Sequence, residues 1–145
     1  MSLKGINILS AVLCEEVRQE VGGRAIIIGA MAHGPELSDG EDTRIKRLAV
    51  YTEIEMPENR IRLKLRLASK NQEDPVLQAD VNTDEMYDDL SSSENWARNP
   101  IAVLIFGREN FMLRGSGDYH LQYAVDDEDW VDCRNFYFPK ADPKE

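Results

Sequence analysis

The stretch Ile61-Arg-Leu-Lys-Leu-Arg-Leu67 decides the fold class of this chain. Apolar side chains at every second position alternate strictly with the cations Arg62, Lys64 and Arg66. Successive side chains of a β-strand point to opposite faces of a sheet, whereas a helix would scatter these leucines around its cylinder. The stretch therefore predicts a strand with one face on a core and three cations on the other face.

Turn residues divide the chain on both sides of this strand into further short strand candidates. These candidates are 45–55, 76–81, 101–106, a short edge piece at 111–114, 118–125 and 130–138. Eight or nine short strands without a convincing helix predict an all-β fold, an antiparallel two-sheet β-sandwich. A β-barrel is the alternative. We expect one domain over residues 1–145, with a flexible tail at 139–145.

The segment Gly117-Asp-Tyr119-His-Leu121 favours an immunoglobulin-like sandwich. In such folds a tyrosine near the start of the penultimate strand donates its hydroxyl hydrogen to nearby backbone. Leu121 stands where antibody domains carry a disulfide cysteine. We therefore expect Tyr119 to be buried, with its hydroxyl bonded to a residue shortly before it in the chain.

Charge and cysteine content restrict the partners and the compartment. The chain has 27 acidic and 17 basic residues, so its formal net charge is -10. A field of that sign repels phosphate, and we expect neither a nucleic-acid nor a membrane partner. A single disulfide between Cys14 and Cys133 stays open, but free buried thiols in a reducing compartment are favoured. Leu13 stands where a lipoprotein signal needs a small residue, and we expect a cytoplasmic protein.

The opening stretch, residues 8–30, has two apolar arms joined at Gly22-Gly23, which predicts a long hairpin. Charges interrupt its first arm, and they are the candidate binding residues: Glu15, Glu16, Arg18 and Glu20. A departure from the local pattern is typical of functional or interface sites. The alternative is an open face on which charge prevents edge-to-edge aggregation.

Residues 14–24, Cys-Glu-Glu-Val-Arg-Gln-Glu-Val-Gly-Gly-Arg, are followed by Ile26-Ile-Ile-Gly29. This segment resembles the opening of a family of small uncharacterised bacterial proteins, a domain of unknown function. Its members begin with an apolar strand, a cysteine, an acidic pair, Val-Arg, a Gly-Lys turn and a hydrophobic strand. Arg24 stands where lysine is usual. The resemblance implies a β-rich fold and no particular activity.

Catalytic motifs are missing from the sequence. His33 and His120, the two histidines, have no metal-ligand spacing with the cysteines. Cys14 is flanked by carboxylates, which raise a thiol pKa and make a poor nucleophile. Neither a phosphate-binding loop nor a nucleophile elbow is present. We therefore expect no enzyme, no catalytic residues and no cofactor.

Acidic segments give the remaining candidates. Asp126, Asp127 and Asp129 are weak calcium candidates at an expected hairpin tip, together with Asp84, Glu85, Asp88 and Asp89. A solvated tip without metal is the favoured interpretation. The cations of 62–66 either bind an anion or pair with the acidic segment 71–97, with Asp80 as the expected partner. We favour internal pairing.

The sequence thus predicts a non-catalytic binding or assembly module of the bacterial cytoplasm. We expect it to form a homo-oligomer or bind a protein partner through a sheet edge or face. The alternative is a small-ligand or metal-dependent enzyme with its site among the acidic loops. A convergent pocket of carboxylates and a histidine would favour the enzyme.

Overall fold

A computed structural model describes residues 6–20, 24–55, 61–82 and 101–142 of the chain. Within these ranges the protein is all-β, and every strand pairing is antiparallel. The strands are β1 (Asn7–Cys14), β2 (Glu16–Gln19), β3 (Ala25–Ile28), β4 (Thr43–Glu55), β5 (Arg62–Ala68), β6 (Leu77–Asn82), β7 (Ile101–Leu113), β8 (Gly117–Val125) and β9 (Val131–Phe138).

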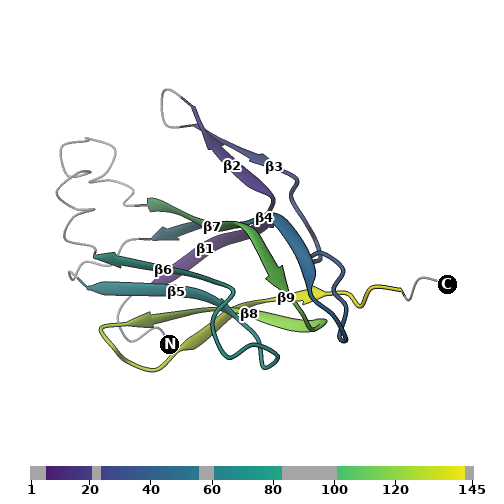
Figure 1. Cartoon of the computed structure of the whole chain (residues 1–145). Helices are drawn as coiled ribbons and strands as arrows, with labels where there is room; N and C mark the ends of the chain where they lie inside the picture. The colour runs from purple at the N-terminus through teal and green to yellow at the C-terminus, as the bar shows by residue number, and fades with distance from the viewer. Residues whose placement is uncertain (1–5, 21–23, 56–60, 83–100, 143–145) are drawn as a thin grey trace.

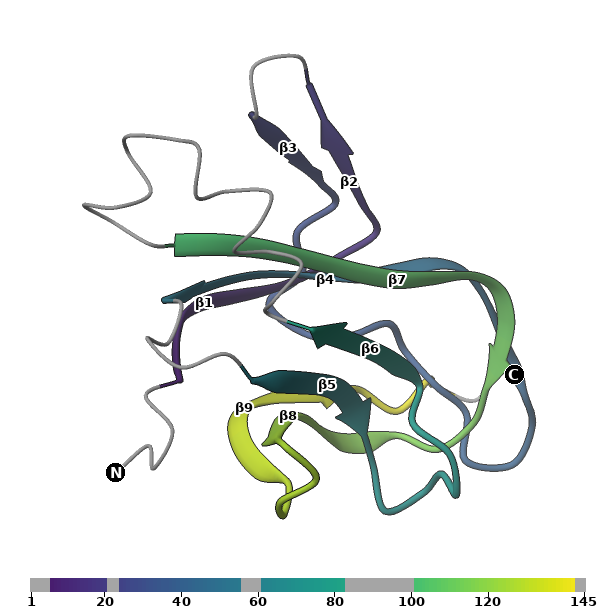
Figure 2. The same cartoon turned by 90° about the vertical axis from the view of Figure 1, so that its left-hand side faces the viewer.

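The strands form two main sheets and one separate hairpin. One sheet has the order β1-β4-β7, and the other has the order β6-β5-β8-β9. The two sheets lie one above the other, and the β2–β3 hairpin stands off this two-sheet body (Figures 1 and 2). The described pairings do not close the strands into a barrel, so the barrel alternative is wrong.

The alternation at 61–67 sets the inner face of the four-stranded sheet. Ile61, Leu63, Leu65 and Leu67 are all buried, as expected. Leu65 and Leu67 belong to a cluster that also contains side chains of the three-stranded sheet: Ala11, Leu13, Leu48, Val50 and Phe106. Both sheets therefore turn their apolar faces toward one shared core, and burial of that core is the main favourable term in folding.

Tyr119 confirms the expectation drawn from its position. Its side chain is fully buried, and its hydroxyl donates to the carbonyl of Gly115 at 2.7 Å. Its ring stacks on Phe138 with centroids 4.1 Å apart. Gly115 has a φ of +99°, a conformation in which a side chain would be strained. The corner before β8 is thus held by one buried hydrogen bond and one ring contact.

The cations of β5 are internally paired. The Arg62 guanidinium donates to both carboxylate oxygens of Asp80, at 3.0 and 2.6 Å, which confirms the expected pair. Lys64 pairs instead with Asp127 of the β8–β9 turn at 2.8 Å. Arg66 donates to Gln122 at 2.7 Å and lies over the ring of Trp130. Because all three are engaged, the anion-binding alternative for this stripe loses its support.

The opening stretch differs from the expected long hairpin. β1 pairs with β4 rather than with the second apolar arm, and only β2 and β3 form a hairpin. β1 carries Ala11 and Leu13 into the shared core, and that burial is available only beside β4. The stretch therefore divides at Glu15, where the chain bends out of the sheet.

Three further expectations need correction. Segments 101–106 and 111–114 are one strand, because Gly107 lies within β7 and does not end it. A Cβ at Gly107 would lie 2.8 Å from the carbonyl oxygen of Leu48, so glycine permits the close approach of β4.

Both cysteines are free, but only Cys14 is buried and Cys133 is exposed. Within the expected flexible tail, Lys140 forms a parallel bridge with Leu37.

Candidate functional site

The β2–β3 hairpin leaves the body of the protein and returns to it at one point. A backbone bridge joins Leu13 to Met31, and the Met31 N–H donates to the Leu13 carbonyl at 2.8 Å. Above this bridge the Glu15 N–H donates to the Ile28 carbonyl at 3.1 Å. Gly29 has a φ of +68°, and a Cβ there would lie 2.8 Å from Glu15 Cγ. Glycine is therefore required at the turn back into the body.

The second strand of the hairpin is apolar and open to solvent. β3 reads Ala25-Ile26-Ile27-Ile28, and the Ile26 residue is 43% exposed. Ala25 is exposed as well, while Ile27 and Ile28 are half-buried. An isolated two-stranded hairpin is marginally stable in water. An apolar strand with an exposed isoleucine on such an element is compatible with a contact surface as well as with a solvated arm.

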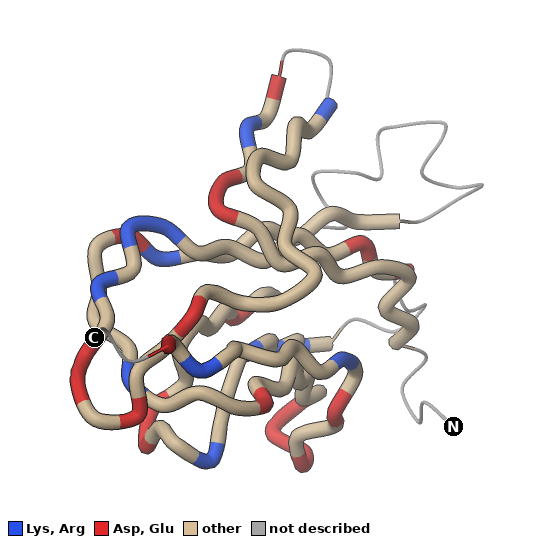
Figure 3. Tube along the Cα trace, turned by 90° about the vertical axis from the view of Figure 1, so that its right-hand side faces the viewer, with Lys and Arg blue, Asp and Glu red and all other residues tan. Residues whose placement is uncertain are grey.

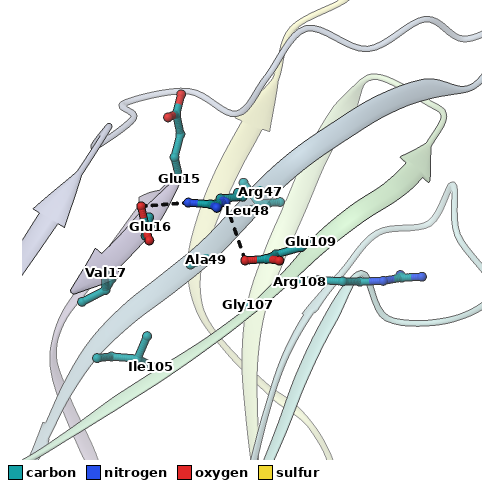
Figure 4. A pocket seen from close by; sticks show the side chains of 10 residues that line it. All are labelled: Glu15, Glu16, Val17, Arg47, Leu48, Ala49, Ile105, Gly107, Arg108 and Glu109. Carbon is teal, nitrogen blue, oxygen red and sulfur yellow. Dashed lines mark ion pairs between the residues drawn. The ribbon is translucent and has the colours of Figure 1, made fainter. Parts of the chain in front are cut away.

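A cleft of about 350 Å³ lies between the base of the hairpin and the outer face of the three-stranded sheet (Figure 4). Ala49 of β4 and Gly107 of β7 line it on the sheet side, where small residues leave room. Val17 of β2 and Ile105 of β7 supply its apolar wall. The cleft is open and shallow, so it is suited to a side chain of a partner more than to an enclosed small molecule.

Ion pairs connect the hairpin to the sheet across this cleft. Arg47 of β4 lies 3.0 Å from the Glu16 carboxylate and 3.6 Å from that of Glu109 on β7. Arg18 lies 3.7 Å from the same Glu16 oxygen. The side chains are partly exposed, so each pair contributes at most about 1 kcal/mol. Of these three pairs, Arg47–Glu16 is the one that joins the hairpin to the sheet.

The four candidate residues predicted from the sequence fall into two groups. Glu15 and Glu16 line the cleft, and Arg18 contacts Glu16. The Glu15 carboxylate points away from Arg47 (Figure 4). Glu20 directly follows β2, and its backbone N–H donates to the Arg24 carbonyl at 2.7 Å. The structure thus brings three of the four to the base of the hairpin and leaves Glu20 near its tip.

Arg47 and Glu109 belong to this site and were not predicted. They lie opposite one another in the β4–β7 register. Each is an ordinary charged residue on a strand, so neither stands out from its local pattern. Only the pairing of β4 with β7, which the sequence pattern does not show, places them together beside Glu16.

Cys14 lies at the base of the hairpin and is fully buried. Its thiol points to the Ala49 carbonyl oxygen at 3.6 Å, and desolvation by burial raises its pKa. A thiol that stays protonated is a poor nucleophile. Cys133 is an exposed residue, but its thiol donates to the Leu121 carbonyl at 3.1 Å, and desolvation raises its pKa to about 11. Neither cysteine is activated.

Two of the three acidic candidates at the β8–β9 turn, which are Asp126, Asp127 and Asp129, are engaged in other contacts. Asp126 accepts a hydrogen bond from the Arg62 backbone N–H at 2.9 Å, and Asp127 holds Lys64. That lysine lowers the pKa of Asp127. Within the described ranges, no group of three or more histidine, cysteine or acidic residues could hold a metal ion. Four other candidates fall outside those ranges: Asp84, Glu85, Asp88 and Asp89.

The two histidines lie apart from the hairpin. His120 lies 4.0 Å from Asp132 of β9, and His33 makes an edge contact with the ring of Tyr137.

In the ranges 6–20, 24–55, 61–82 and 101–142, no helix is long and apolar enough to cross a membrane.

The described fold and site define an all-β protein of two antiparallel sheets that carries a projecting hairpin with a cleft at its base. Comparison with protein-family models, with curated proteins and with solved structures finds no match.

Proposed function

We propose that the protein is a non-catalytic binding or assembly module of the bacterial cytoplasm, and that the β2–β3 hairpin contacts its protein partner. One observation carries this proposal: the hairpin stands off both sheets and exposes Ile26 at 43% (Figure 2). Apolar surface held out in water is unfavourable. A partner that covers the hairpin would remove this cost and order a marginal element.

The base of the hairpin supports this role. The Glu16–Arg47–Glu109 network joins β2 to β4 and β7, and it restricts the direction in which the hairpin projects. A binding element that is already oriented loses less entropy when it meets its partner. The charged residues that interrupt the first arm therefore serve positioning, while the apolar strand β3 supplies the contact.

We also propose an immunoglobulin-like classification for the two-sheet body. When the hairpin is left out, seven described strands remain. The first, second and fifth of them, which are β1, β4 and β7, form one sheet. The other sheet holds the fourth, third, sixth and seventh. Immunoglobulin constant-type domains likewise separate the first, second and fifth strands from the third, sixth and seventh, but their fourth strand joins the first group, whereas β6 pairs with β5. Tyr119 occupies the position of their tyrosine corner. In this scheme β2–β3 is an insertion between the first two strands, and such folds commonly bind through the segments that join their strands.

The remaining partners and the compartment follow from charge and thiols. The net charge of -10 disfavours nucleic acid and anionic lipid, and both free cysteines fit a reducing cytoplasm. We propose no cofactor.

Site-specific photo-crosslinking in the source cell tests the proposal. A photoreactive residue replaces Ile26 in one variant and Met112 of β7, which is 56% exposed, in a matched control. We expect a discrete protein adduct from position 26 and none of the same mass from position 112. The absence of an adduct at position 26, or the same adducts at both positions, would overturn the proposal.

A further inference from the structure

We propose that the hairpin binds a second copy of this chain, through an antiparallel pairing of β3 with β3 of the partner subunit centred on Ile26. This inference rests on the proposed function, because it names the partner of the same hairpin. Three features support it: the free backbone edge of β3, the self-complementary hydrogen-bonding register of that edge about Ile26, and the charge of the hairpin.

The outer edge of β3 has no strand beside it in the described part of the chain. The carbonyls of Arg24 and Ile28 both accept hydrogen bonds from the β2 side of the hairpin, at 2.7 and 3.1 Å. Backbone groups alternate in direction along an antiparallel strand. Ile26 therefore also turns its N–H and C=O toward β2, while Ala25 and Ile27 direct theirs outward. These two residues present an unpaired edge to solvent.

This edge is complementary to itself. With a twofold axis at Ile26, Ala25 of one subunit lies opposite Ile27 of the other, and each such pair exchanges two N–H···O bonds. Ile26 then faces Ile26 of the partner subunit in a non-hydrogen-bonded pair, where side chains lie closest. The most exposed isoleucine of the hairpin is thus covered by its own copy. Twofold dimers of this kind are the commonest oligomers.

The charge distribution favours contact at the hairpin rather than elsewhere. The chain carries a formal charge of -10, so two copies repel one another through their net charge. Residues 16–28 carry two acidic and two basic side chains, Glu16, Glu20, Arg18 and Arg24, and are neutral as a unit. Acidic and basic positions alternate along the described hairpin (Figure 3). Because the hairpin projects from the body, a contact between two hairpins lies away from the two sheets. In the proposed register Arg24 lies opposite Ile28, so no like charges face each other.

The other sheet edges in the described part of the chain are charged or partly covered. β1 has no charged residue, but its Leu13 carbonyl accepts a hydrogen bond from the Met31 N–H and its Ala11 carbonyl accepts one from the Arg134 guanidinium. β6 carries Asp80. β9 carries Asp132 and Arg134, and β7 carries Arg108 and Glu109. Charged side chains of this kind discourage pairing at an edge. Ala25–Ile28 contains no charge and no proline. The pairing involves four residues a side, well below a standard interface, so we expect reversible association with a Kd of about micromolar or weaker.

Disulfide trapping tests the register. In a Cys133→Ser background, Ile26→Cys places two thiols in a non-hydrogen-bonded pair, where the Cα separation suits a disulfide. The matched control is Val131→Cys on β9, which is 45% exposed against 43% for Ile26. We expect the position 26 variant to form covalent dimers about tenfold faster than the control, because pairing raises the local thiol concentration. Ile28→Cys is a second control. In this register Ile28 lies opposite Arg24 of the other copy, so the two introduced thiols are four residues apart along the paired strands, and we expect no disulfide between them.

Sedimentation velocity supplies a second measurement that needs no cysteine. We expect wild type to shift toward dimer as its concentration rises, Ile26→Lys to stay monomeric, and Val131→Lys to behave as wild type. Circular dichroism checks that all three variants are folded. A wild type that stays monomeric at high concentration, or trapping at position 26 no faster than at position 131, overturns the dimer. If the photo-crosslink at position 26 then captures a different protein, the dimer fails and the proposed function stands. If position 26 captures nothing, both fail.

Discussion

The two-sheet body and the β2–β3 hairpin use similar residues in opposite ways. In the body, the leucines of β5 are fully buried, and every cation between them has a partner. In the hairpin, three consecutive isoleucines lie on a strand with one open edge. The comparison shows that apolar β-branched sequence alone does not mean core. Stability resides in the body, and the exposed edge is available for contact with another molecule.

The largest expected difference between the two regions concerns truncation of an apolar side chain. Leu65→Ala removes a fully buried side chain from the shared core and should lower the free energy of unfolding by about 2–5 kcal/mol. Ile26→Ala should change it by no more than about 0.5 kcal/mol, because that residue is 43% exposed and outside both buried clusters. Urea unfolding at low protein concentration measures both. Equal losses would show that the hairpin is part of the core.

A smaller effect is expected at the corner before β8. Tyr119→Phe keeps the ring on Phe138 but leaves the Gly115 carbonyl without its hydroxyl donor, which should cost about 1–2 kcal/mol. Tyr137→Phe is the matched control, because Tyr137 is 48% exposed, and it should be within about 0.5 kcal/mol of wild type. Thermal and chemical unfolding compare the two variants. An equally large loss at Tyr137 would contradict the role given to the buried hydroxyl.

The smallest expected effect concerns the junction between the two regions. Arg47→Gln removes both ion pairs at the base of the hairpin and should lower global stability by no more than about 1 kcal/mol. Local opening of residues 16–28 should nevertheless increase, seen as faster hydrogen exchange of their amides. The difference from wild type should shrink at high salt, which screens exposed charges.

Arg44→Gln is the control for this measurement. Arg44 lies on the same strand and makes one long hydrogen bond to Asn110, at 3.4 Å. Its removal should leave exchange in the hairpin unchanged. Faster exchange in both variants would mean that the hairpin responds to the charge of β4 in general and not to the contacts of Arg47.

Much of the body was predictable because its signals are local. The alternation at 61–67 and the Gly-x-Tyr element at the start of β8 each depend on adjacent residues, and burial follows directly from side-chain direction. The division of the opening stretch at Glu15 was not predictable, because pairing of β1 with β4 depends on a segment far along the chain. The continuity of β7 through Gly107 was hidden for the same reason, since the glycine reflects the approach of β4.

The candidate site shows the same limit. Glu16 and Arg18 were identified because charges interrupt an apolar arm. Their neighbours Arg47 and Glu109 were not, because they become neighbours only when β4 pairs with β7 over its full length. Local pattern therefore found the half of the site on the hairpin and missed the half on the sheet.

The bridge between Leu13 and Met31 has a consequence for how this protein can change. Since the chain leaves and rejoins the body at adjoining positions, the hairpin strands β2 and β3 contribute no side chain to the buried core, whereas Cys14 before them still belongs to it. Related sequences with this fold are therefore free to lengthen, shorten or replace the hairpin segment while keeping both sheets intact. Variation in partner choice among related chains should therefore concentrate between these two residues.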